Sequence, residues 1–158
     1  MKNIYQIENR NYPTSGLFLN KYRNDYYTCL EYQDDFNYYE NTPIDNIQFD
    51  GKHSLPWDFF TVEGLNYLLP RILYLIQIEI DELPISLLDF IINMTMTERI
   101  IELIENLKFP DLNILNLIIE DILYKKSHEV VSEIGEHYLF LDLEFLASKL
   151  SQNYNQPH

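Results

Sequence analysis

The chain has 158 residues, and its 25 Asp and Glu against 11 Lys and Arg give a formal net charge of −14 at pH 7. A protein that binds phosphate groups needs a basic surface, so this charge argues against nucleic acid or an anionic membrane as a partner. It favours a cationic protein instead. The length predicts a single domain, and a hydrophobic content of 46% with only four glycines predicts a folded chain.

The cysteine content and the hydrophobic pattern indicate the cellular compartment of the protein. Cys29 is the single cysteine, so no disulfide forms within the chain and a reducing compartment is favoured. The opening residues, MKNIYQIE, lack the apolar core of a signal peptide. No apolar stretch reaches the roughly 20 residues that span a bilayer. We therefore expect a soluble cytoplasmic protein without contact with a membrane.

The composition changes near residue 55. Residues 1–54 hold eight of the thirteen tyrosines and form an irregular, aromatic and acidic part. Within this part we expect a helix over residues 20–32 and an extended piece over residues 44–49, and a short strand pair is an alternative. Residues 55–150 are rich in Leu and Ile at helical intervals and predict a helical body. Residues 151–158 are expected to form a flexible tail.

The first helix of the body begins at Thr61, a good N-cap, with Glu63 in a first turn that favours negative charge. Pro70 lies inside this helix, where it removes one hydrogen-bond donor, so we expect a kink or a break near Tyr67. The apolar face follows the i, i+3, i+4, i+7 rule and consists of Leu65, Leu68, Leu69, Ile72, Leu73, Ile76 and Ile80.

Two shorter helices are predicted next. Pro84, at a first-turn position, opens one that runs to about Met94. Thr97 caps the other, which Pro110 ends. The apolar stripe of this second helix is formed by Ile100, Ile101, Ile104 and Leu107.

A fourth helix of the body is predicted from Asp111 as its N-cap to Lys125 and Lys126, whose charges suit the C-terminal end of the dipole. Its inward face consists of Leu112, Leu115, Ile118, Ile119, Ile122 and Leu123. Residues 128–134 predict a short helix, which the following glycine stops. Residues 138–150 predict a last helix, and a strand over residues 138–143 is the alternative.

One segment resembles a known family. Residues 56–70 read PWDFFTVEGLNYLLP. They resemble a bacterial family of unknown function in which an aromatic residue precedes Phe-x-Thr-x-Glu, followed by aromatic-x-Leu-Pro at the start of a long helix. The resemblance implies an α-helical bacterial protein and supplies no catalytic residue. By its small size, acidity and helical content, the chain also resembles immunity proteins of bacterial toxin systems, especially those of contact-dependent growth inhibition.

The patterns that carry catalytic or metal chemistry are weak. Glu129, Glu133 and His137 have i, i+4, i+8 spacing, but Gly135 interrupts the helix and no known zinc spacing is present, so we interpret them as a solvated face. Cys29 has tyrosines and Glu31 as its sequence neighbours, which do not supply the electropositive setting of a reactive thiol, so we expect a buried or bystander cysteine. The glycines are isolated, so no phosphate-binding loop exists. We predict no catalytic residue, no metal site and no cofactor.

The acidic, tyrosine-rich tract over residues 25–40 is the candidate binding surface. Tyrosine is a frequent interface anchor, and the surrounding carboxylates attract a cationic partner. The alternative is that the rings pack on the helical body while the acids face water. The residues predicted to bind the partner are Asp25, Tyr27, Glu31, Asp34, Asp35, Tyr38, Tyr39 and Glu40.

We therefore predict a mainly α single domain without enzymatic activity. We expect it to be an immunity protein that binds and neutralises a cognate toxin domain, of a basic nuclease type. An acidic DNA mimic that occupies a nucleic-acid-binding protein is the alternative from another class, and a metal-dependent enzyme is the third.

Overall fold

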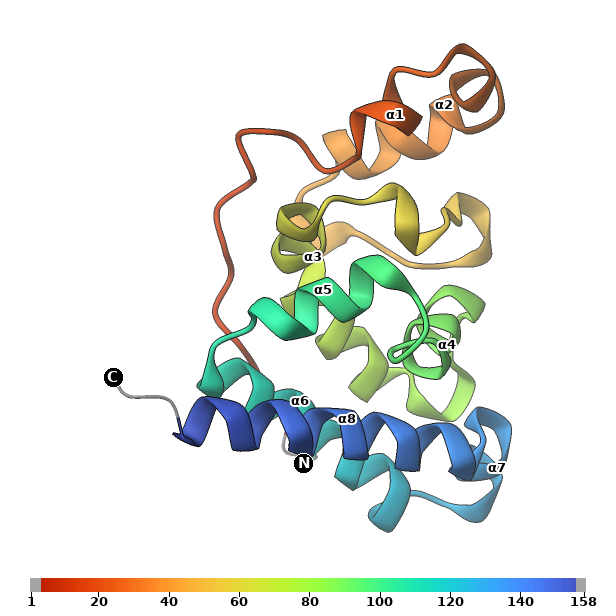
Figure 1. Ribbon diagram of the computed structural model, residues 1–158. Helices are drawn as coiled ribbons and strands as arrows, with labels where there is room; N and C mark the ends of the chain where they lie inside the picture. The colour runs from red at the N-terminus through yellow and green to blue at the C-terminus, as the bar shows by residue number, and fades with distance from the viewer. Residues whose placement is uncertain (1–3, 156–158) are drawn as a thin grey trace.

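The computed structural model describes residues 4–155, with side chains described through residue 152. Within that range the chain forms eight α-helices, four short 3-10 helices and no β-sheet (Figure 1). Helices cover most of the described residues, which confirms the predicted mainly α fold. None of the described helices is both long and apolar enough to cross a bilayer.

The aromatic N-terminal part forms two helices where one was predicted. α1 covers Asn20–Arg23 and α2 covers Tyr26–Asn41. The predicted helix over residues 20–32 is therefore wrong in two respects. The helix breaks between Arg23 and Tyr26, and the second helix continues to Asn41. The cause of the break is Asp25, which caps α2: its carboxylate accepts hydrogen bonds from the backbone N–H and the hydroxyl of Thr28, at 2.9 and 2.8 Å.

The segment over residues 44–49 is extended only in part, because its first half is helical and Ile47 then has extended dihedral angles (φ −68°, ψ 129°). It begins with the 3-10 helix η1, Ile44–Asn46, and then places Ile47 and Phe49 in the core. The alternative of a short strand pair within the N-terminal part is also wrong. In the described residues one isolated antiparallel bridge occurs instead, between Phe18 and Phe60, and it joins the N-terminal part to the helical body.

α3, Val62–Ile78, begins as predicted, because the Thr61 hydroxyl accepts the backbone N–H of Gly64 at 2.9 Å. The helix runs through Pro70 without the break that was one of the two expected outcomes. Its buried residues lie together on one side of the helix, and this packing outweighs one missing hydrogen bond. The buried residues are Gly64, Leu65, Leu68, Leu69, Ile72, Leu73, Leu75 and Ile76.

α4, Ile85–Ile92, and α5, Glu98–Asn106, correspond to the two predicted shorter helices. α6, Phe109–Lys125, begins before the predicted cap Asp111, which lies in its first turn. Pro110 therefore opens α6 instead of ending α5, because a first-turn residue needs no backbone N–H donor.

α7, His128–Ile134, ends at Gly135, whose φ of 103° is a conformation that other residues rarely adopt. α8, Glu136–Asn155, is helical throughout, so the alternative strand over residues 138–143 is wrong. The helix also includes the first part of the expected tail, and residues 156–158 lie outside the described residues.

The helices form one body with a continuous core. α6 and α8 lie side by side along one end, with α7 between them in the chain, and α3 packs on α5 (Figure 1). α1 and α2 lie at the opposite end, over an aromatic part of the core. An N-terminal segment without helix, residues 4–13, runs along the side of the molecule and connects the two ends.

Candidate functional site

The outward side of α2 carries a group of large exposed side chains. Tyr26, Tyr27 and Leu30 are 69%, 77% and 66% exposed, and the two tyrosine rings meet edge to face at 5.4 Å between centroids. Glu31 and Asp34 are also exposed, and the i, i+3, i+4, i+7 spacing from Tyr27 places both on the same side of the helix. We call these five residues the exposed α2 face.

The opposite side of α2 is buried in the core. The inward residues Phe36 and Tyr39 are buried, and the Tyr39 hydroxyl donates to the His53 carbonyl oxygen at 2.6 Å. Burial raises the pKa of Tyr39 well above its ordinary value, so its ring stays neutral. Tyr39 was predicted to bind the partner, but its side chain is 2% exposed and belongs to the core. Its period on α2 matches that of Phe36, a signal that was available in the sequence.

Asp35 and Tyr38 connect α2 to the 3-10 helix η2, Gly51–His53. The Asp35 carboxylate lies 3.2 Å from His53 Nδ1, and the Tyr38 ring stacks on the His53 ring at 4.1 Å between centroids. The Tyr38 hydroxyl also accepts the backbone N–H of Gln48 at 2.8 Å. Both predicted partner-binding residues are thus half-buried and already engaged within the fold.

Glu40, near the C-terminal end of α2, joins this helix to Arg23 at the end of α1. Its carboxylate accepts two hydrogen bonds from the Arg23 guanidinium, at 3.0 and 3.1 Å, and this bidentate contact raises the pKa of Arg23. Arg23 also lies against Cys29, with Nη1 3.7 Å from Sγ. The sequence neighbours of Cys29 did not indicate this cation, which comes from the end of α1.

Four of the eight predicted residues remain exposed together: Asp25, Tyr27, Glu31 and Asp34. Asp25 also caps α2, and the hydrogen bonds from Thr28 lower the pKa of its carboxyl. In the described part of the chain, neither Glu31 nor Asp34 forms an ion pair, so their charges are available to a partner. Tyr26 and Leu30 were not predicted, although both lie in the same helical tract.

The alternative metal-binding segment is divided between two helices. Glu129 and Glu133 lie on α7, and His137 lies on α8 beyond Gly135. All three acidic or imidazole side chains are exposed. No group of three His, Cys, Asp or Glu residues within residues 4–155 is arranged to hold a metal ion.

Asp142 on α8 is a buried carboxyl that sequence reasoning missed. It is 0% exposed, and neither carboxyl oxygen has a hydrogen-bond partner among the described residues. Removal from water raises the pKa of Asp142 to about 8. A signal was present in the sequence, because Asp142 shares the helical stripe of Leu139 and Leu146, which are both buried.

Comparisons of the chain with protein-family models, with curated proteins and with solved structures find no match. The resemblance of residues 56–70 to a bacterial family therefore remains a prediction. The functional argument rests on the exposed α2 face and on the charge of the chain.

Proposed function

We propose that this chain is an immunity-type inhibitor that binds a cationic toxin domain through the exposed α2 face. The observation that carries the proposal is the grouping of Tyr26, Tyr27 and Leu30, each more than 60% exposed, beside two carboxylates on one helix. Tyrosine anchors framed by acidic residues are the composition expected where a protein attracts and then holds a basic partner.

The apolar part of the face supports a protein partner. Two tyrosine rings and a leucine side chain remain in water on a helix whose other side is fixed in the core. Rigid aromatic side chains lose little conformational entropy on binding, so they make effective anchors. Single exposed apolar residues are ordinary on protein surfaces, whereas an adjacent group of three supports an interaction site.

The acidic part of the face supports a cationic partner. Glu31 and Asp34 form no ion pair within the described chain, and the net charge of −14 extends the attraction beyond the contact itself. A nuclease has a basic active site that holds phosphate groups, which makes a nuclease-type toxin domain a fitting target. Such an inhibitor acts in the cytoplasm, where Cys29 stays reduced.

Rescue of intoxicated cells tests the proposal. A candidate toxin domain, sought among the genes adjacent to the gene of this chain, is expressed with the wild-type chain or with the double variant Tyr27→Ala, Leu30→Ala. Wild type should restore growth, and the double variant should rescue less well because the anchors are lost. Tyr124→Ala is the matched control, since Tyr124 is 68% exposed on α6, away from the exposed α2 face.

Three results would contradict the proposal. The first is full rescue by the double variant, and the second is equal loss with Tyr124→Ala. The third is absence of rescue by the wild-type chain together with competition against DNA for a nucleic-acid-binding protein, which would favour a DNA mimic.

A further inference from the structure

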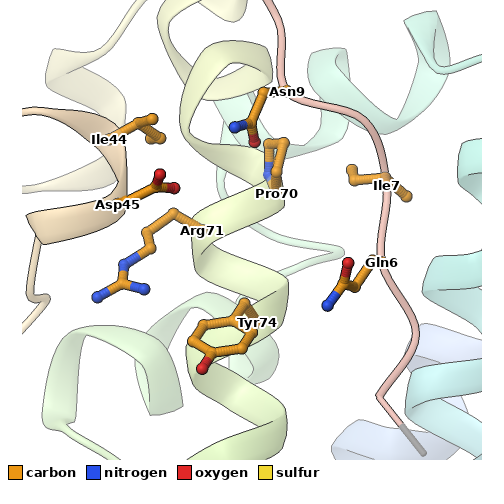
Figure 2. Close-up of a pocket in the computed structure, with 8 residues that line it drawn as sticks. All are labelled: Gln6, Ile7, Asn9, Ile44, Asp45, Pro70, Arg71 and Tyr74. Carbon is orange, nitrogen blue, oxygen red and sulfur yellow. The ribbon is translucent and has the colours of Figure 1, made fainter.

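A pocket of about 360 Å³ lies across α3, between the N-terminal segment and η1 (Figure 2). Gln6 and Asn9 line it from the N-terminal segment, Asp45 lines it from η1, and Arg71 and Tyr74 line it from α3. Its volume lies at the lower end of the range of about 300–1,000 Å³ that is typical of small-molecule sites. It uses no residue of the exposed α2 face.

Arg71 differs from the other three arginines of the chain. Arg10 pairs with Asp111, Arg23 pairs with Glu40, and Arg99 pairs with Glu98 and Glu102. Arg71 forms no ion pair with any described carboxylate, although the chain has more than two acids for each base. A guanidinium without an ion pair keeps the positive charge and the donors that bind the carboxylate of a ligand.

The guanidinium of Arg71 is held in place before any ligand binds. Its Nε donates to the Ile47 carbonyl oxygen at 2.9 Å, and its central carbon lies 5.4 Å from the centroid of the Tyr74 ring. These contacts use one nitrogen and one face of the group. The two terminal nitrogens remain as the paired donors that fit a carboxylate.

The charge of the protein selects among carboxylate ligands. A ligand with net negative charge is repelled by the net charge of −14, whereas a zwitterion carries no net charge and escapes this repulsion. Asp45 is exposed at the same pocket and forms no ion pair within residues 4–152, so it complements an ammonium group. Figure 2 shows Asp45 and Arg71 on the same side of α3.

We infer that this pocket binds a small zwitterion of the α-amino-acid type, with its carboxylate on Arg71 and its ammonium group toward Asp45. The side-chain amides of Gln6 and Asn9 supply further donors and acceptors. Ile7, Ile44 and Pro70 add apolar walls, which favour an aliphatic side chain on the ligand.

Titration of the full chain with L-leucine, followed by backbone amide resonances in NMR spectra, tests this inference. Leucine should produce saturable shifts at Gln6, Asn9 and Asp45. Leucinamide lacks the carboxylate, and N-acetyl-leucine lacks the ammonium group, so each should bind at least about tenfold more weakly.

Two variants separate binding from folding. Arg71→Met should abolish the leucine shifts, but it also removes the hydrogen bond to the Ile47 carbonyl oxygen. Asp45→Asn leaves the fold intact, because Asp45 is exposed, and should weaken leucine binding at least about tenfold. Asp81→Asn, an exposed acid outside the pocket, should change nothing. The inference is overturned by the absence of saturable leucine shifts, by equal binding of N-acetyl-leucine, or by unchanged affinity in Asp45→Asn.

Discussion

The Asp58 carboxylate accepts the backbone N–H of Arg99 at 3.2 Å and so caps the start of α5 from a distant part of the chain. Asp58 belongs to the 3-10 helix η3, Trp57–Phe59, within the segment of residues 56–70. Thr97, the residue at the N-cap position, makes no side-chain hydrogen bond to the helix. The nearby Trp57 indole donates to the Ser86 carbonyl oxygen at 3.1 Å. The segment thus joins α3, α4 and α5.

The cap by Asp58 leads to a stability prediction. Asp58→Ala should lower the free energy of unfolding by about 1 kcal/mol, because the N–H of Arg99 loses its acceptor. Thr97→Ala is the matched control and should have a smaller effect, since the Thr97 hydroxyl makes no cap. Urea denaturation of the two variants measures the difference. An effect of Thr97→Ala that equals or exceeds that of Asp58→Ala would contradict this assignment.

Gly64 permits a close approach between the N-terminal part and the helical body. A Cβ atom at Gly64 would lie 2.3 Å from the backbone carbonyl oxygen of Leu17. That oxygen also accepts the backbone N–H of Thr61 at 2.9 Å, so it has little freedom to move. Gly64→Ala should therefore lower the free energy of unfolding by about 2 kcal/mol or more.

Gly51→Ala is the matched control for Gly64→Ala. A Cβ at Gly51 meets no atom within 4 Å, so this change should stay within about 0.5 kcal/mol of the wild type. Thermal unfolding of both variants provides the comparison. Similar melting temperatures for Gly64→Ala and Gly51→Ala would contradict the prediction, because they would show that the Leu17 carbonyl moves aside at little cost.

The buried Asp142 makes stability depend on pH. Its pKa is about 8 in the folded chain and about 4 in an unfolded chain, so between these values the folded state holds a proton that the unfolded state has released. The contribution of this group to the free energy of unfolding is fully present below about pH 4. It is lost as pH rises toward about 8.

Asp142→Asn removes this titration. The difference in free energy of unfolding between the variant and the wild type should shift in favour of the variant by about 1.4 kcal/mol per pH unit inside that window. Asp142→Leu should show the same trend at higher overall stability, because it places an apolar group in an apolar site. Urea denaturation at several pH values measures both. Parallel pH profiles for wild type and variants would refute a neutral buried carboxyl.

We expect the carboxylates and the tyrosine rings of the exposed α2 face to act on different rate constants of binding. Glu31→Lys with Asp34→Lys should lower the association rate of the proposed toxin partner and reduce its dependence on salt, because exposed charges act mainly on encounter. Tyr27→Ala should instead raise the dissociation rate by a factor that corresponds to about 2 kcal/mol or more if the ring is a central anchor. Surface-based kinetics at two salt concentrations separate the effects. Unchanged rates in both variants would place the contact elsewhere.

Local patterns in the sequence determined most of the helices. The Thr61 cap, the proline before α4 and the glycine after α7 act on residues that are close in the chain, so their effects do not depend on the rest of the fold. The apolar stripe of α3 likewise predicted its buried side, since a helix places every third or fourth residue together.

Only the tertiary structure decided which members of the acidic, tyrosine-rich tract remain available to a partner. Tyr38 and Asp35 are withdrawn because the ring of His53, from the separate 3-10 helix η2, stacks on Tyr38 and places a nitrogen beside the Asp35 carboxylate. Glu40 is withdrawn in the same way, by its ion pair with Arg23. Hydrogen bonds and ion pairs between distant residues depend on how the chain returns on itself, which no local spacing specifies. The exposed α2 face is what remains after these pairings are made.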